Sequence, residues 1–108
     1  MASTAEEHRA NRVVILDMRK LTAFCDYFII CSGNSTIHMR TVADAIQEKS
    51  KENDIEPLHA EGYNDAKWIL LDYNDVVVHI FGEEEREFYN LEGLWGDAKP
   101  LRKTYKRT

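Results

Sequence analysis

Two apolar runs separated by a short polar stretch constrain the fold of this chain more than any other feature. Residues 67–73 and 76–81 are rich in β-branched and aromatic side chains, a pattern that predicts a β-hairpin. The turn falls at Tyr73-Asn74 or at Asn74-Asp75. Because these two registers differ by two residues, both give the same facing of the side chains.

The two faces of this hairpin differ in character. One face is purely aliphatic, and we expect it to be core: Ile69, Leu71, Val76, Val78 and Ile80. The other face adds a carboxylate, an imidazole and an indole to its apolar side chains: Trp68, Leu70, Asp72, Val77, His79 and Phe81. A mixed face of this kind is either covered by an irregular layer of the same chain or kept for a partner. His79 is accordingly a packed structural histidine or a partner contact, and aromatic anchors such as Trp68 are enriched at interfaces.

The remaining elements follow from periodicity and capping residues. They are, in order, a short helix over 4–11, buried strands over Val13–Met18 and Tyr27–Cys31, a helix capped by Ser35 or Thr36, a short strand over 57–61, the hairpin, and a helix from Glu83. The helix after Ser35 or Thr36 has a buried stripe formed by Met39, Val42, Ala43, Ile46 and Ser50. The apolar side of the helix from Glu83 carries Phe88, Leu91 and Trp95. This order predicts one α/β (α+β) domain over residues 1–97, with a mixed sheet of about five strands and helices mainly on one face. The second face of the sheet would then be incompletely covered.

The charge of the chain is asymmetric. The formal net charge is −5, from 14 basic and 19 acidic residues, and five of the basic ones lie after Asp97. Residues 1–97 therefore hold nine basic residues against 19 acidic ones, a formal charge of −10. A body this acidic is a poor nucleic-acid binder, so we expect RNA contacts only from a basic, flexible tail over 98–108, through Lys99, Arg102 and Lys103.

Composition predicts a cytoplasmic protein. No apolar run approaches the roughly 20 residues that span a bilayer, and the acidic first residues are unlike a signal or transit peptide. Cys25 and Cys31, if they share a strand, lie about 20 Å apart, too far for a disulfide. Both are expected to be buried apolar residues in a reducing compartment.

We find no pattern of residues that predicts catalysis, a metal site or a cofactor. The histidines are scattered without carboxylates at ligand spacing, and no Asp-x-Asp pair follows a strand to hold magnesium. The turn Ser32–Ser35 precedes a helix, where free backbone N–H groups can hold a phosphate. An ordinary helix cap is one interpretation, and a nucleotide-binding or nucleotidyl-transfer site is the alternative.

Several linked motifs resemble the ribosomal silencing factor family, also called RsfS or Iojap. They are Asp26-Tyr27-Phe28-Ile29-Ile30-Cys31-Ser32-Gly33-Asn34-Ser35-Thr36, Glu61-Gly62, Trp68-Ile69-Leu70-Leu71-Asp72-Tyr73, Asp75-Val76-Val77-Val78-His79-Ile80-Phe81 and Glu87-Phe88-Tyr89-Asn90-Leu91-Glu92-Gly93-Leu94-Trp95. The similarity runs in order from about Val13 to Asp97. Fewer residues precede Val13 than the longer first helix of family members needs.

The resemblance implies a nucleotidyltransferase-like fold without the catalytic residues, and a protein that is not an enzyme and needs no cofactor. It implies binding to the large ribosomal subunit through ribosomal large-subunit protein fourteen, which blocks joining of the small subunit and represses translation under nutrient limitation. The family's contact surface includes the hairpin tryptophan, here Trp68, and the facing of the strands places Leu70, His79 and Phe81 beside it. The resemblance also implies a homodimer when the protein is free. Besides ribosome silencing and nucleotide binding, a third interpretation is a plain dimerisation domain that buries the aromatic face against a second copy.

Overall fold

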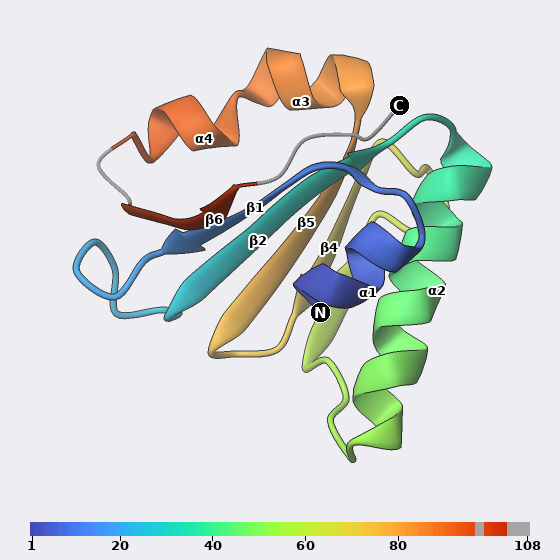
Figure 1. Ribbon diagram of the computed structural model, residues 1–108, viewed down its shortest axis with the longest axis horizontal. Coiled ribbons are helices and arrows are strands. Elements are labelled where there is room, and N and C mark those ends of the chain that lie inside the picture. The colour runs from blue at the N-terminus through green and yellow to red at the C-terminus, as the bar shows by residue number, and fades with distance from the viewer. Residues whose placement is uncertain (97–98, 104–108) are drawn as a thin grey trace.

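The mixed sheet that the sequence predicts is confirmed, and it has six strands among the residues described by the computed structural model, 1–96 and 99–103. The strand order is β3-β4-β5-β2-β1-β6 (Figure 1). The elements are α1 (Ala2–Glu7), β1 (Asn11–Asp17), β2 (Tyr27–Gly33), α2 (Thr36–Glu52), β3 (His59–Glu61), β4 (Trp68–Asp72), β5 (Val76–Gly82), α3 (Glu83–Tyr89), α4 (Leu91–Leu94) and β6 (Lys99–Lys103).

The parallel pair β2 and β5 forms the centre of the sheet. Their register places Ile29 opposite Val78 and Cys31 opposite Ile80, and every other recorded pairing is antiparallel. After β2 the chain passes through α2 to the far edge at β3 and returns through β4 to β5, beside β2. Both central strands are therefore hydrogen-bonded to a neighbouring strand along each of their two edges.

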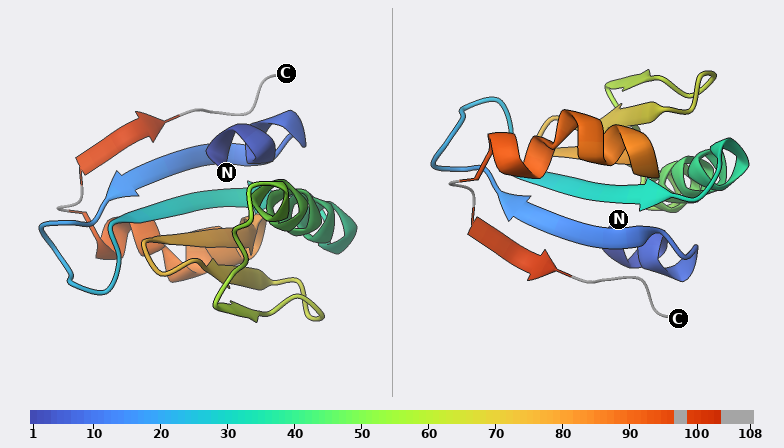
Figure 2. Two further views of the ribbon diagram at one scale, coloured as in Figure 1. Left: turned by 90° about the horizontal axis from the view of Figure 1, so that it is seen from below. Right: turned by 90° about the horizontal axis from the view of Figure 1, so that it is seen from above.

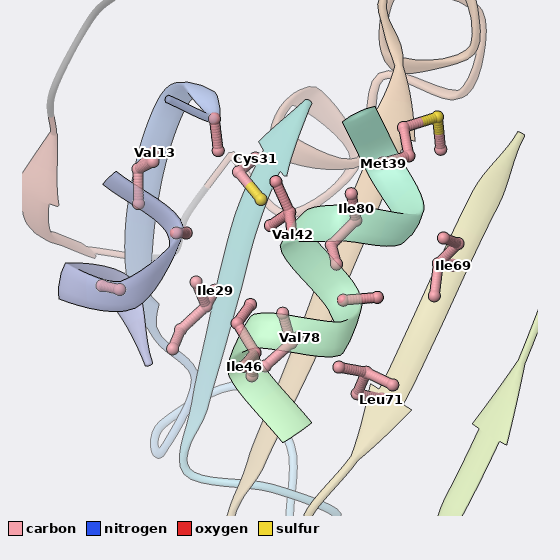
Figure 3. Packing of buried hydrophobic residues seen from close by; sticks show 14 of the residues in the cluster. Val13, Ile29, Cys31, Met39, Val42, Ile46, Ile69, Leu71, Val78 and Ile80 are labelled. Carbon is pink, nitrogen blue, oxygen red and sulfur yellow. The ribbon is translucent and has the colours of Figure 1, made fainter. Parts of the chain in front are cut away.

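The first core lies between the sheet and the helices α1 and α2 (Figure 3). The buried residues of α2 are the stripe that its helical period predicts: Met39, Val42, Ala43, Ile46 and Ser50. They pack against the aliphatic face of the hairpin, where Ile69, Val78 and Ile80 have no exposed surface. Ser35 is the helix cap, since its hydroxyl accepts a hydrogen bond from the His38 backbone N–H at 3.0 Å.

The hairpin turn takes the second of the two predicted registers. The Tyr73 backbone N–H donates to the Val76 carbonyl at 2.8 Å, which leaves Asn74-Asp75 as the two turn residues. Asn74 has a φ of 74°, in the left-handed region, and its own N–H donates to the Asp72 carboxylate at 2.8 Å. Asparagine tolerates this backbone conformation better than most residues, which explains its place here.

The second face of the sheet carries its own layer, formed by α3 and α4, opposite α1 and α2 (Figure 2). The sequence predicts one helix after β5, but Asn90, with a φ of 44°, ends α3 and caps α4. A second core lies beneath this layer and includes Ile30, Phe81 and Leu91. Two short helices thus cover part of the second face, and Trp68 and Leu70 on that face remain half-buried.

The sixth strand corrects the prediction of a wholly flexible basic tail. The backbone of β6 pairs antiparallel with β1, with Lys99 opposite Asp17 and Lys103 opposite Val14. Without β6, the outer edge of β1 would present a row of unpaired backbone N–H and C=O groups. Pairing with these groups explains why a segment that lacks an alternating apolar pattern forms a strand here. Residues 98 and 104–108 of the predicted tail, and residue 97 at the end of the predicted domain, lie outside the described residues.

Candidate functional site

An aromatic cluster on the second face of the sheet is the candidate site. Adjacent strands place Trp68 opposite Phe81 and Leu70 opposite His79. The Trp68 and Phe81 rings have centroids 4.9 Å apart, and the His79 and Phe28 rings pack in a T-shaped arrangement with centroids 4.6 Å apart. The four side chains predicted to form a partner-binding site therefore share one face of one hairpin.

These four residues differ in exposure. Trp68 and Leu70 are half-buried, whereas His79 is 4% exposed and Phe81 is fully buried. The rings around His79 are those of Phe28, Trp68 and Phe81. Phe81 is covered by Tyr89 of α3 and shares a core with Leu91 of α4, which the sequence did not predict. Trp68 and Leu70 therefore keep some side-chain surface that solvent reaches, whereas His79 and Phe81 are buried.

His79 holds the Trp68 side chain in place through a hydrogen bond from the neighbouring strand. The Trp68 Nε1–H donates a hydrogen bond to His79 Nδ1 at 3.1 Å. Because Nδ1 accepts, the proton of the neutral ring resides on Nε2, a buried atom with no hydrogen-bond partner among the described residues. Burial lowers the pKa of His79 to about 4, so the ring is neutral near pH 7 and the bond to Trp68 persists. The burial of His79 and its hydrogen bond to Trp68 support the interpretation of His79 as a packed structural histidine.

A buried arginine anchors the layer above the cluster, and sequence reasoning missed it. Arg86 is 3% exposed and binds Glu92 through two parallel bonds, Nε to Oε1 at 2.8 Å and Nη2 to Oε2 at 3.0 Å. Its Nη1 donates to the Asn11 carbonyl at 3.2 Å and to the Ser32 hydroxyl at 3.3 Å. Arg86 therefore joins α3, α4, β1 and β2. An arginine among glutamates in a helix gives no sequence signal of such burial.

The start of α3 is held by a second set of contacts. The Glu83 carboxylate accepts hydrogen bonds from the Ser32 hydroxyl at 2.9 Å and from the Asn11 side chain. Partial burial works to raise the pKa of Glu83, but these bonds and the Arg12 guanidinium keep it below the usual value. Arg12, at a bulge in β1 with a φ of 47°, also forms an ion pair with Glu87 at 3.2 Å.

The exposed face of α3 differs from the prediction. Phe88, expected on the buried apolar side of the helix, is 81% exposed, and Tyr89 is 49% exposed. The reversal at Asn90 explains this, because Leu91 then reaches the core from a separate helix instead of continuing the stripe of α3. Tyr89 lies against Trp68, with ring centroids 4.9 Å apart. The periodicity of a single helix gave no signal for this arrangement.

The turn at Ser32–Ser35 uses its polar groups within the chain. Ser35 caps α2, and the Asn34 backbone N–H donates to His38 Nδ1 at 2.9 Å. Ser32 lies against the Glu83 carboxylate, which repels an incoming phosphate. The helix-cap interpretation is confirmed at Ser35, and these contacts disfavour the nucleotide-binding alternative.

Within residues 1–96 and 99–103 there is no group of three or more His, Cys, Asp or Glu side chains that could hold a metal ion. In the same part of the chain, no helix is both long and apolar enough to cross a bilayer. Cys25 and Cys31 are buried free thiols, and burial raises the pKa of Cys31 to about 12. Lys99, Arg102 and Lys103 lie in β6, at the edge of the sheet beyond β1.

The protein-family model described as "Ribosomal silencing factor during starvation" matches residues 1–107. This chain belongs to the ribosomal silencing factor family. A "Ribosomal silencing factor RsfS" from Bacillus subtilis is 43% identical over 97 residues, which cover 90% of this chain and 82% of that protein. "Protein Iojap, chloroplastic" from Zea mays is 36% identical over 104 residues, 94% of this chain and 44% of that protein.

Solved structures agree with the assignment to the silencing factor family. A crystal structure of a protein from Chromobacterium violaceum superposes with a TM-score of 0.85 at 30% identity, covering 98% of this chain and 86% of that one. A second, from Bacillus halodurans, gives 0.78 at 40% identity and covers 86% of this chain and 87% of that one. The family that the sequence motifs indicate and the mixed α+β fold are both confirmed. The family is named for a regulatory role on ribosomes rather than for a reaction.

Proposed function

We propose that this protein acts in the cytoplasm as a ribosomal silencing factor, without catalysing a reaction. It binds the large ribosomal subunit through ribosomal large-subunit protein fourteen and blocks joining of the small subunit by steric exclusion. Translation is thereby repressed when nutrients are limiting. Membership of the silencing factor family supports the general role, and the properties of the second face support the mode of binding.

The observation that carries the proposal is the half-buried Trp68, held by His79 at the surface of the second face. A fixed aromatic side chain beside a half-buried leucine, Leu70, is typical of the anchor of a protein interface. The formal charge of −10 over residues 1–97 suits a basic ribosomal protein, because opposite charge steers the encounter.

Sedimentation with separated large and small subunits, together with a subunit-joining assay, tests this proposal. We expect the protein to migrate with the large subunit and to inhibit joining. Trp68→Ala should weaken binding at least about tenfold, as should Leu70→Asp, which removes apolar contact by a different change. Ile37→Ala is the matched control, since Ile37 is a 73% exposed apolar residue on α2, on the other side of the sheet. Absence of the protein from the large-subunit fraction would refute the proposal.

Two finer parts of the proposal have their own tests. The first is that basic residues of β6 contact ribosomal RNA. Neutralising Lys99, Arg102 and Lys103 to Gln should make binding less dependent on salt, because fewer counterions are released. An unchanged salt slope would remove the RNA contact. The second is that the free protein is a homodimer, which sedimentation velocity measures directly. If Trp68→Ala dissociates the dimer and leaves ribosome binding intact, the aromatic face serves dimerisation instead.

A further inference from the structure

The loop between β1 and β2, residues 18–26, displays an aromatic side chain that the fold does not use. Phe24 is 90% exposed, the highest value of any large apolar side chain in residues 1–96. The loop lies at the end of the sheet where β1 finishes, β2 starts and β6 begins (Figure 1). A single exposed ring needs no explanation by itself, so the residues around it decide whether it has a role.

The loop is held in one arrangement by contacts at both of its ends. The Met18 backbone N–H donates to the Asp26 carbonyl at 2.8 Å, which closes the loop. Met18 and Cys25 are buried in the second core, and the Phe24 backbone N–H donates to the Thr22 hydroxyl at 3.1 Å. Because the ends of the loop do not have to order on binding, less free energy is lost when Phe24 meets a partner.

The charged residues of the loop are divided between its two sides. Arg19 and Lys20 follow β1, whereas Asp26 precedes β2. The Asp26 backbone N–H donates to the carbonyl of Asp75, in the hairpin turn, at 2.7 Å. Because β1 lies beside β6 and β2 lies beside β5, the cations are on the β6 side of the loop and the acids are on the hairpin side.

The basic side of the loop continues into β6. The strand register places Lys99 opposite Asp17, next to the loop, and the other two basic residues of β6 follow along the same edge. The Asp17 carboxylate is already bound by Arg19, through Nε at 2.9 Å and Nη2 at 2.7 Å. Lys20 forms no salt bridge with any residue that the structure describes. Basic residues therefore gather at this edge, although residues 1–97 carry a formal charge of −10.

A phenyl ring beside cations is a combination that binds unpaired nucleotides. Unstacked bases of RNA stack on aromatic side chains, and Lys and Arg interact with the phosphates on either side. Duplex RNA is disfavoured because its bases are already stacked on one another. A lipid surface is disfavoured because the loop exposes little apolar area besides Phe24, chiefly the 37% exposed Leu21.

We infer that Phe24 stacks on an unpaired nucleotide of ribosomal RNA, while Lys20 and Lys99 contact the neighbouring phosphates. The inference rests on the proposed function, and it gives the RNA contact of β6 a defined kind of target. The protein then contacts the large subunit at two separate places. Trp68 meets a ribosomal protein, and the loop between β1 and β2 meets RNA.

Titration of large subunits with labelled variants at position 24 tests the stacking contact. Phe24→Ala should raise the Kd at least about fivefold, and Phe24→Leu should do the same because leucine has no aromatic face. Phe24→Trp should bind at least as tightly as the parent protein, since indole offers a larger face for stacking. Position 24 is exposed, so all three variants should keep the thermal unfolding midpoint of the parent protein.

The same titration at several salt concentrations tests the phosphate contact. Lys20→Gln should raise the Kd and make binding less dependent on salt, because fewer counterions are released. Lys51→Gln is the matched control, since Lys51 is an exposed lysine on α2 that forms no salt bridge with any described residue. It should leave the Kd within about twofold of the parent protein and the salt slope unchanged.

The outcomes separate the inference from the proposed function. If Trp68→Ala loses binding while Phe24→Ala binds like the parent protein, the proposed function stands and the inference is wrong. If Phe24→Leu binds normally and Phe24→Trp does not, the ring enters an apolar pocket of a protein, which also overturns the inference. A salt slope that Lys20→Gln leaves unchanged would exclude the phosphate contact. If the parent protein does not bind large subunits, the proposed function and the inference both fail.

Discussion

The two faces of the sheet are both buried but are built differently. On the face beneath α2 the packed side chains are almost entirely aliphatic, and the helix that covers them has 17 residues. On the other face the covering helices have seven and four residues, and an arginine, a histidine and several aromatic rings replace aliphatic packing. The difference shows that the first face supplies a conventional core, while the second supplies a core and a surface fixed by polar contacts.

The largest expected effect tests whether the second face is core at all. Ile80 and Phe81 are neighbours on β5, point to opposite faces and have no exposed surface. Ile80→Ala should lower the free energy of unfolding by about 2–5 kcal/mol, and Phe81→Ala by about 3–5 kcal/mol. Urea denaturation measures both. A cost below about 1 kcal/mol for Phe81→Ala would mean that α3 and α4 do not form a packed layer.

The next effect concerns the polar anchor. Arg86→Met removes the guanidinium that donates hydrogen bonds to the Glu92 carboxylate and the Ser32 hydroxyl. Since Glu92 is 32% exposed, we expect a loss of about 2–3 kcal/mol, below the range for a fully buried pair. The double variant Arg86→Met/Glu92→Leu should recover part of it, because the carboxylate that the guanidinium held is then removed as well. Equal stability of the single and double variants, compared by urea denaturation, would contradict this role for the ion pair.

The pH dependence of the free energy of unfolding also distinguishes the two faces, because His79 lies on the second face. Its pKa is about 4 in the folded protein against 6.5 as the ordinary value. Between these values the unfolded state binds more protons, so stability is full above about pH 6.5 and falls as the pH decreases. At pH 5 the loss should be about 2 kcal/mol. We expect His79→Gln to remove this slope and His8→Gln, at an exposed position, to retain it in urea titrations across pH. A slope unchanged in His79→Gln would assign the effect elsewhere.

The smallest effect concerns the break between α3 and α4. Asn90 has a φ of 44° and its side chain accepts a hydrogen bond from the Gly93 N–H at 3.2 Å. Asn90→Ala should cost about 1 kcal/mol through strain and loss of the cap, whereas Asn90→Gly should cost a few tenths. Thermal unfolding monitored by circular dichroism compares the two. Equal midpoints for both variants would show that the left-handed turn is not held by Asn90.

Much of the fold, and which residues lie together in the candidate site, could be predicted from the sequence. Side-chain period and turn chemistry are local properties, and they located the hairpin, the α2 stripe and the grouping of Trp68 with Leu70, His79 and Phe81. Exposure was predicted less well. Phe88 was expected inside and is outside, because one left-handed residue reorients the chain.

The sequence by itself determined which residues share a face, since alternation along a strand and the helical repeat follow from backbone geometry. It also determined the family, through motifs spread over the whole domain. Only the tertiary structure decided which face α3 and α4 cover, that β6 joins the edge of β1, and that Arg86 is buried. Those features depend on contacts between residues far apart in the chain, such as Arg86 with the carbonyl of Asn11, which local pattern does not encode.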